Sequence, residues 1–236
     1  PSHRFAWWLH MIKARLRRKE AKKVAYLGRH VPPGGVILDI GAHFGYFSKE
    51  FCRLHNHSCH VYGFEPVSYT RSILELVTRS FGNFSLHSTA LSDANGEADI
   101  QIPIKKSGHI GIGLSHLGEE RNRDFISETI TTLKLDTFMA ATGLTRIDFI
   151  KCDVEGAELA VFKGGANTIA TFRPTVFCEV NDQFTQRMGY RAADLFDFFQ
   201  QLGYQVCRVD VTTNIEHPVL EYAGPDDYLF VPPSVK

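Results

Sequence analysis

The sequence predicts an α/β fold, in which a mostly parallel, twisted sheet carries helices on both faces. Short apolar runs recur along the chain without strict alternation, and helical stretches separate them. This is the pattern of strands that are buried on both faces and joined by crossover helices. The first run continues through a glycine-bearing turn into a helix, at residues 36–51. A length of 236 residues suits one domain of this kind.

The expected elements follow a Pro-Gly break at residues 32–35, which ends any preceding helix. Buried-type apolar runs mark the strands, and longer amphipathic stretches mark the helices. We expect strands at 36–40, 61–64, 84–91, 147–152 and 175–180, helices at 45–54, 68–80, 158–171 and 192–202, and a C-terminal antiparallel hairpin from 204–211 and 227–231.

Residues 100–131 interrupt this alternation with a stretch that contains glycines, histidines and charges. Long insertions in compact domains often contact ligands. We therefore expect this insertion to face the substrate. His109 and His116 are its candidate substrate contacts, and a neutral imidazole there is a rival general base.

Charge divides the chain into a basic helix at 1–34 and a main domain at 35–236. Residues 1–30 hold nine of the 26 Lys and Arg but only one of the 26 Asp and Glu, Glu20. A helix at 6–30 is expected to pack on the core, or to contact a membrane surface or a partner. The acidic remainder argues against a nucleic acid partner. The apolar stripe of this helix comprises Trp7, Trp8, Met11, Ile12 and Leu16.

Several classes of protein are disfavoured by composition. The five cysteines are odd in number and form no C-x-x-C pair, so neither a disulfide framework nor a zinc site is indicated. No apolar run approaches the roughly 20 residues of a membrane span. We expect a cytoplasmic protein without a metal.

The strongest local signal is VILDIGAHFGYFSKEF at residues 36–51. Glycine allows a tight turn and lets a ligand approach the backbone, and the following helix offers free N–H groups. His43 stands where a dinucleotide fingerprint has its second glycine, and no P-loop motif occurs, which disfavours NAD and ATP. The expected cofactor contacts here are Asp39, Gly41, Ala42, His43 and Gly45.

A second signal is VYGFEP at residues 61–66, where Glu65 ends the next strand. A carboxylate at this position can accept hydrogen bonds from both hydroxyls of a ribose. Ser92 and Asp93 follow the third strand and are expected near an adenine ring, although LSDANG is also an ordinary turn.

Charged residues also follow two later strands. IDFIKCDVEGAE, at residues 147–158, places four charged residues around the carboxyl end of a strand, where open α/β sheets bind ligands: Lys151, Asp153, Glu155 and Glu158. Capping of the next helix accounts for one or two acids but not for Lys151. Glu179 ends another strand and either faces the same cleft or points to solvent.

These motifs together resemble the FkbM-type methyltransferases. The resemblance rests on LDIGAHFGYFS, VYGFEP, ALSD with NG, TTLKLDTF, DFIKCDVEGAELAVFKGG and RPTVFCE with the later LGY, in the family's order from about residue 35 to 205. It implies a Rossmann-like class I methyltransferase fold, S-adenosylmethionine as the methyl donor, and O-methylation of a sugar, glycan or natural-product hydroxyl. The basic N-terminal helix lies outside the match.

For methyl transfer, Asp153 is the expected residue nearest the reacting centre, and it also counts among the cofactor contacts. Glu155 is the alternative base, and Lys151 is expected to orient a carboxylate or the acceptor. A small-molecule or glycan acceptor is implied. Two other functions remain open from sequence, a nicotinamide-dependent oxidoreductase and a non-catalytic binding module with this fold.

Overall fold

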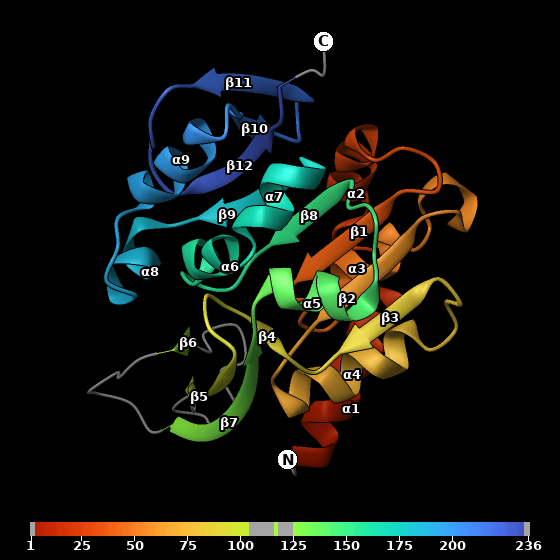
Figure 1. Cartoon of the computed structure of the whole chain (residues 1–236). Helices are drawn as coiled ribbons and strands as arrows, with labels where there is room; N and C mark the ends of the chain where they lie inside the picture. Colours follow the sequence, from red (N-terminus) through yellow and green to blue (C-terminus); the bar gives the residue numbers. More distant parts are fainter. Residues whose placement is uncertain (1–2, 104–115, 118–124, 234–236) are drawn as a thin grey trace.

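An eight-stranded sheet forms the centre of the computed structural model, which describes residues 3–103, 116–117 and 125–233 (Figure 1). Within these residues the strand order is β11-β10-β12-β9-β8-β1-β2-β3. The five strands from β9 to β3 pair in parallel, and the three at the other edge pair antiparallel. The strands are β1 (Val36–Ile40), β2 (His60–Phe64), β3 (Phe84–His87), β8 (Phe149–Cys152), β9 (Thr175–Val180), β10 (Gln205–Asp210), β11 (Ile215–Val219) and β12 (Asp226–Val231).

Helices cover both faces of this sheet, as the sequence predicts. On one face, the buried side chains of α5, α6, α7 and α9 pack against β1, β8 and β9. On the other, α2 and α3 pack against the same strands, and α4 lies beside α3. The bounds are α2 (Ala21–Leu27), α3 (Tyr46–Phe51), α4 (Ser68–Thr78), α5 (Leu135–Thr142), α6 (Glu158–Gly164), α7 (Ala166–Phe172), α8 (Asp182–Arg187) and α9 (Ala192–Gln201), with 3₁₀ turns η1 (Gly28–His30) and η2 (Leu54–His57).

A second, four-stranded sheet contains the described part of the predicted insertion. It has the order β4-β7-β5-β6, and β5 and β7 form its long antiparallel pair. The strands are β4 (Ala90–Leu91), β5 (Gly96–Pro103), β6 (His116–Leu117) and β7 (Phe125–Leu133). The single strand expected at 84–91 is therefore wrong, because β3 and β4 belong to different sheets.

The N-terminal segment is two helices rather than the continuous helix expected at 6–30. Four residues, 17–20, separate helix α1 (His3–Leu16) from α2. The buried ammonium of Lys49, on α3, donates to the carbonyls of Ala14 (2.5 Å) and Arg17 at the end of α1. These acceptors are carbonyls that a helix end leaves without intrahelical partners. Residues 17–20 contain no Gly or Pro, so the sequence does not indicate a helix break there. The contacts with Lys49 support the break instead.

Two further boundaries differ from expectation. The helix expected at 158–171 is divided into α6 and α7 at Gly165, whose added Cβ would come within 2.6 Å of Leu135. The expected pairing of β10 with β12 is confirmed as antiparallel, but β11 lies between them in sequence and pairs with the outer edge of β10.

Gly41, directly after β1, allows a close approach between two backbone segments. Its φ is +75°, and a Cβ there would lie 1.9 Å from the carbonyl oxygen of Asp153. No side chain fits in that space. The turn after β1 and the segment after β8 can therefore meet only because residue 41 is glycine.

Gly34 offers a matched control for Gly41, because its φ is +72° and no atom lies within 4 Å of its added Cβ. We expect Gly34→Ala to cost about 1–2 kcal/mol of unfolding free energy, the strain of a left-handed alanine. Gly41→Ala adds a backbone clash and is expected to cost about 4 kcal/mol or more. Urea unfolding followed by circular dichroism measures both. Equal losses would contradict the close approach.

Candidate active site

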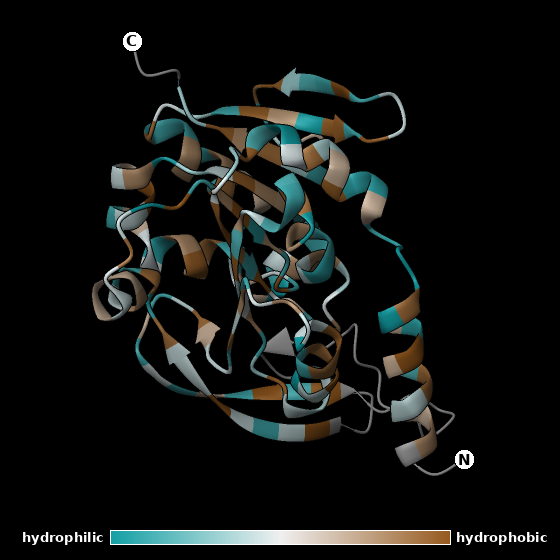
Figure 2. Ribbon diagram, turned by 90° about the vertical axis from the view of Figure 1, so that its right-hand side faces the viewer, coloured by the Kyte–Doolittle hydropathy of each residue, from teal (hydrophilic) through white to brown (hydrophobic). Residues whose placement is uncertain are grey.

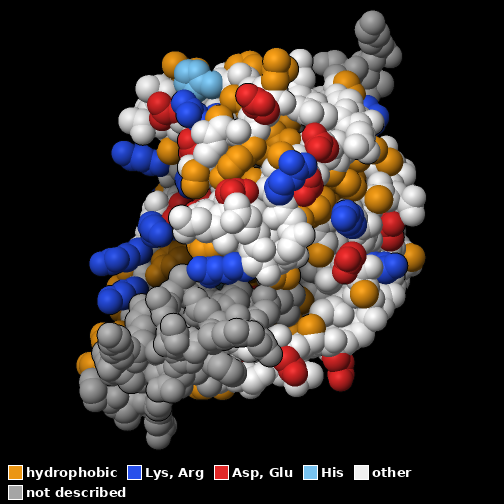
Figure 3. All heavy atoms as spheres, turned by 90° about the vertical axis from the view of Figure 1, so that its left-hand side faces the viewer, with side chains coloured by type: hydrophobic (Ala, Val, Ile, Leu, Met, Phe, Trp, Pro, Cys, Tyr) orange, Lys and Arg blue, Asp and Glu red, His pale blue; other side chains and the backbone are white. Residues whose placement is uncertain are grey.

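A cavity of about 380 Å³ opens at the carboxyl ends of β1, β2 and β8, within the size range of small-molecule sites. Figure 3 shows a hollow on this side of the molecule, with hydrophobic side chains inside and Lys and Arg side chains on its border. The polar and charged side chains that line the cavity are Lys19, Glu20, Lys23, His43, Tyr46, Glu65, Thr70, Thr89, Lys151, Asp153, Glu155 and Glu179.

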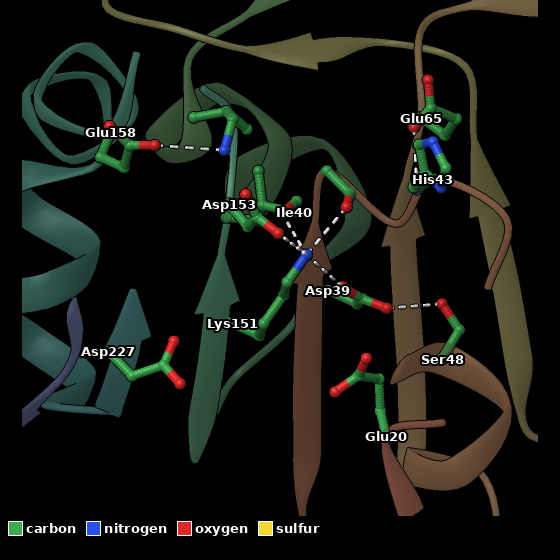
Figure 4. A network of polar contacts seen from close by, with 12 residues as sticks. Glu20, Asp39, Ile40, His43, Ser48, Glu65, Lys151, Asp153, Glu158 and Asp227 are labelled. Atoms are coloured by element: carbon green, nitrogen blue, oxygen red, sulfur yellow. Dashed lines mark hydrogen bonds and ion pairs between the residues drawn. The ribbon is translucent and has the colours of Figure 1, made fainter. Parts of the chain in front are cut away.

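The side chain of Lys151 connects the segments after β1 and β8, which form the floor of this cavity (Figure 4). Its side chain is 3% exposed, and its ammonium donates to the carbonyl of Gly41 at 2.8 Å. The ammonium also lies 3.4 Å from Asp39 Oδ1 and 3.5 Å from Asp153 Oδ2. Burial alone would lower the pKa of Lys151, but the charges of Asp153 and Asp39 raise it above its ordinary value. Lys151 is therefore a fixed cation that joins β1 to β8.

Asp39 lies behind the cavity wall rather than in it. It is fully buried, and its Oδ2 accepts a 2.5 Å hydrogen bond from Ser48 Oγ. Its Oδ1 has no hydrogen-bond partner among the described residues and faces only the Lys151 ammonium. Asp39 thus supports Lys151, whereas the sequence suggested direct contact with a cofactor.

Glu65 lines the cavity and is fixed by three donors. Its Oε2 accepts from the backbone N–H of His43 at 2.8 Å, and its Oε1 accepts from Val67 N–H at 3.0 Å and from Thr70 Oγ1 at 2.8 Å. Burial raises the pKa of Glu65, and these hydrogen bonds oppose that rise. Each carboxylate oxygen accepts about two hydrogen bonds, so Oε2 retains capacity for a ligand donor.

Three carboxyl groups face the other end of the cavity: Asp153 and Glu155 follow β8, and Glu179 is near the end of β9. Glu155 has φ +55°, a conformation that costs a non-glycine residue on the order of 1 kcal/mol. Burial, and then the charges of Asp153 and Glu179, raise the pKa of Glu155 to about 8. Partial burial and Asp153 also raise the pKa of Glu179. Close acids of this kind occur at functional sites.

Glu158 supports the loop that carries Glu155. It is 1% exposed, and its Oε1 accepts from the backbone N–H groups of Val154 at 3.2 Å and Gly156 at 3.1 Å. Its Oε2 accepts from Tyr190 OH at 3.2 Å. The carboxylate of Glu158 thus accepts hydrogen bonds that support the loop, and it does not line the cavity.

His43 lines the cavity with a neutral imidazole. Burial, and then the charge of Lys151, lower its pKa to about 4. Its Nε2 is buried without a hydrogen-bond partner among the described residues. A buried polar atom of this kind is usually satisfied by a ligand or water.

The N-terminal segment contributes a wall of the cavity that the sequence did not predict. Lys19 and Glu20, between α1 and α2, and Lys23, on α2, all line it. Lys23 is fixed by Asp227 on β12 at 2.6 Å. Arg18 is held by both carboxylate oxygens of Glu50 on α3. The one sequence signal for this wall is Glu20, a single acid in a segment rich in Lys and Arg.

The remaining site predictions separate into three groups. Gly41, Ala42, His43, Glu65, Lys151, Asp153, Glu155 and Glu179 come together around the cavity. Gly45, Ser92 and Asp93 do not line it, and Asp93 is exposed. His109 lies outside the described residues, and only the backbone of His116, in β6, is described.

Apolar residues line the end of the cavity beside Glu65. Val67, Ile100 and Ile130 form a buried cluster at this end, so the small sheet closes the cavity. The apolar side chains that line this end are Phe64, Val67, Ala90, Leu91, Ile100 and Ile130.

Comparison with known proteins places this site in a family. The chain matches the model of the Methyltransferase FkbM domain over residues 39–206, which contain all of the cavity except its N-terminal wall. The chain belongs to the FkbM methyltransferase family. It is 31% identical over 160 residues to the 2-O-methyltransferase NoeI of Sinorhizobium fredii, which is 64% of this chain and 65% of NoeI. It is 27% identical over 207 residues to the AMB antimetabolite synthetase AmbE of Pseudomonas aeruginosa, which is 75% of this chain and 10% of AmbE.

The chain of this FkbM-family protein thus spans less than two thirds of each of these curated relatives. Among solved structures, the methyltransferase FkbM of Methylobacillus flagellatus matches with a TM-score of 0.51 and 17% identity, over 83% of this chain and 43% of that one. A protein described as a putative rRNA-methylase from Clostridium thermocellum matches with a TM-score of 0.51 and 8% identity, over 91% and 94%. These likenesses show the Rossmann-like methyltransferase fold.

Two features are absent from the described part of this FkbM-family chain. No helix there has the length and apolar character needed to cross a membrane. No group of three or more His, Cys, Asp or Glu residues there is arranged to hold a metal ion.

Replacing Lys151 tests its role in the FkbM-family site. Lys151→Met leaves Asp39 buried without a counter-charge, and we expect the free energy of unfolding to fall by about 3–5 kcal/mol. Adding Asp39→Asn removes the unpaired charge while keeping a partner for Ser48, so the double variant is expected to recover part of the loss. Urea unfolding at pH 7 measures both. A single variant as stable as the unaltered chain, or a double variant that recovers nothing, would contradict the pairing.

Proposed function

We propose that this FkbM-family protein transfers a methyl group from S-adenosylmethionine to a hydroxyl of a sugar, a glycan or a natural product. The observation that carries the proposal is the cavity itself, with a glycine turn and Glu65 on one side and three carboxyl groups on the other. When bound there, S-adenosylmethionine would supply an activated methyl group on a sulfonium.

The residues at the Glu65 end fit the adenosine part of this donor. Glu65 is already oriented by His43, Val67 and Thr70, and its Oε2 retains capacity for a ribose hydroxyl. The apolar residues beside it, including Leu91 and Ile100, suit a flat base. In this proposal they take the place first expected of Ser92 and Asp93.

The charges at the Asp153 end of the cavity favour a sulfonium over a pyrophosphate. The two lysines of the N-terminal wall are paired with acids of their own, Glu20 and Asp227. Asp153, Glu155 and Glu179 all line the cavity, and Lys151 is already paired with Asp39 and Asp153. Carboxyl groups attract a positive ligand and repel a dinucleotide phosphate. The alternative of a nicotinamide-dependent oxidoreductase therefore has less support than methyl transfer, and membership of the FkbM family argues against a non-catalytic module.

Glu155 is the general base in this proposal. A hydroxyl becomes a better nucleophile as its proton leaves, and a base with a pKa near the working pH is the most effective. Glu155 has a pKa of about 8, whereas the pKa of His43 is about 4. Asp153, held by Lys151, would then orient the acceptor beside the methyl group.

Two relatives support the acceptor class. NoeI is described as a 2-O-methyltransferase, which supports an oxygen acceptor. AmbE is described as an antimetabolite synthetase, which supports a natural product. A transfer assay with labelled donor over a panel of sugars, glycans and cell extracts would identify the acceptor.

Calorimetry with S-adenosylhomocysteine and with NAD tests the donor. We expect the first to bind and the second not to. Glu65→Gln replaces an acceptor oxygen by an amide donor and is expected to weaken binding of S-adenosylhomocysteine about tenfold or more. Thr70→Val is the matched control, because it removes one support of Glu65 but keeps the carboxylate. If Glu65→Gln left binding unchanged, or if Thr70→Val weakened binding by the same factor, Glu65 would not be the residue that accepts from the ribose.

The pKa of Glu155 predicts how the rate depends on pH. The base acts when deprotonated, and kcat/KM follows the ionisation of the free protein, so kcat/KM should rise with pH up to about 8 and level off above it. Glu155→Gln is expected to lower kcat by about 10²–10⁴-fold and to abolish this rise. Glu97→Gln, at an exposed position, is the control and should keep the profile. An unchanged profile in Glu155→Gln would show that another group is the base.

A further inference from the structure

Helix α1 has one face that packs against the domain. Met11 and Ala14 are buried against Phe44 and the α4 residues Ile73 and Val77. At the same interface, the Trp7 indole N–H donates to Ser72 Oγ on α4 at 2.8 Å. These contacts fix the rotation of α1 about its own axis, and therefore decide which side chains point away from the domain.

The opposite face of α1 is apolar as well. Its exposed hydrophobic residues are Phe5 (55% exposed), Trp8 (55%), Leu9 (40%), Ile12 (43%) and Leu16 (73%). At 3.6 residues per turn they fall within an arc of about 100°, opposite the buried residues. Figure 2 shows α1 at the margin of the molecule, with hydrophobic residues along its length. A solvated helix face would be polar, so this face requires another explanation.

Basic residues border this apolar face, and α1 contains no acid. On a helical projection, Lys13 falls on one side of the apolar arc and Arg15 on the other. Both are exposed. Arg17, which is exposed, continues the positive charge just beyond the end of the helix. An apolar strip between cations complements the headgroups and acyl chains of an anionic lipid surface.

We propose that α1 docks on an anionic lipid surface, with Phe5, Trp8, Leu9, Ile12 and Leu16 inserted and Lys13 and Arg15 at the headgroups. The helix lies in the plane of the surface, because its 14 residues are too few to cross a bilayer. The proposal does not depend on the methyl donor or the acceptor.

Docking through α1 would also orient the cavity. Lys49 and Glu50 fix the end of α1 to the domain through Ala14, Arg17 and Arg18. The next residues, Lys19 and Glu20, line the cavity. The N-terminal wall of the cavity would thus lie next to the lipid surface.

The two tryptophans of the chain provide a direct test, because Trp8 is on the exposed face and Trp7 on the packed face. The full chain is mixed with vesicles of phosphatidylcholine alone, or of phosphatidylcholine with phosphatidylglycerol. Trp7→Phe leaves Trp8 as the reporter, and its emission should shift to the blue and be quenched by brominated lipids in the anionic vesicles only. Trp8→Phe leaves Trp7, whose emission should not change. An equal response of the two variants, or no shift in either, would overturn the proposal.

Charge variants in a sedimentation assay test the headgroup contacts. Lys13→Gln with Arg15→Gln is expected to weaken binding to the anionic vesicles by about tenfold or more, because each cation near the surface contributes about fivefold. Lys163→Gln with Arg187→Gln makes the same change of charge on α6 and α8 and should leave binding intact. Equal losses in the two pairs would overturn the proposal. So would dimerisation without vesicle binding, since the apolar face would then meet a second copy of the chain.

Discussion

The buried ammonium of Lys151 is the constraint on which the rest of the site depends. It lies where β1 and β8 end, and it joins the carbonyl of Gly41 to the carboxylates of Asp39 and Asp153. The close approach of these two segments is possible because residue 41 has no side chain. One buried cation and one glycine thus fix the cavity floor. The same contacts pair the charge of Lys151 with Asp39 and Asp153. The unpaired charges that face a ligand in the cavity are therefore mainly those of carboxyl groups.

That excess of carboxyl groups would allow one cavity to hold a positive donor and also to contain a base, as we propose. Asp153 is paired with Lys151, whereas Glu155 is partly buried in a strained loop beside two other acids. Neighbouring carboxyl groups with different surroundings acquire different proton affinities, and such differences allow separate roles. Glu158 holds the loop by its backbone, so the position of Glu155 is built into the fold rather than left to a flexible side chain.

The central sheet and most of the cavity were predictable because parallel strands bring their carboxyl ends to one edge. Gly41, Glu65 and Asp153 each follow such a strand, and strand order alone brings them together. The role of Asp39 was not predictable, since the direction of its side chain depends on Lys151 and Ser48. Nor was the wall formed by Lys19 and Glu20, because the break between α1 and α2 depends on contacts with Lys49 and Glu50. Ser92 and Asp93 follow β4, a short strand of the second sheet whose own residues Ala90 and Leu91 line the cavity instead.

The most direct measurement is a crystal structure of the chain with S-adenosylhomocysteine. We expect the ribose hydroxyls within hydrogen-bond distance of Glu65, the base against Leu91 and Ile100, and the sulfur toward Asp153 and Glu155. A ligand bound outside this cavity, or bound in it with the base among the carboxyl groups, would contradict this assignment of the site.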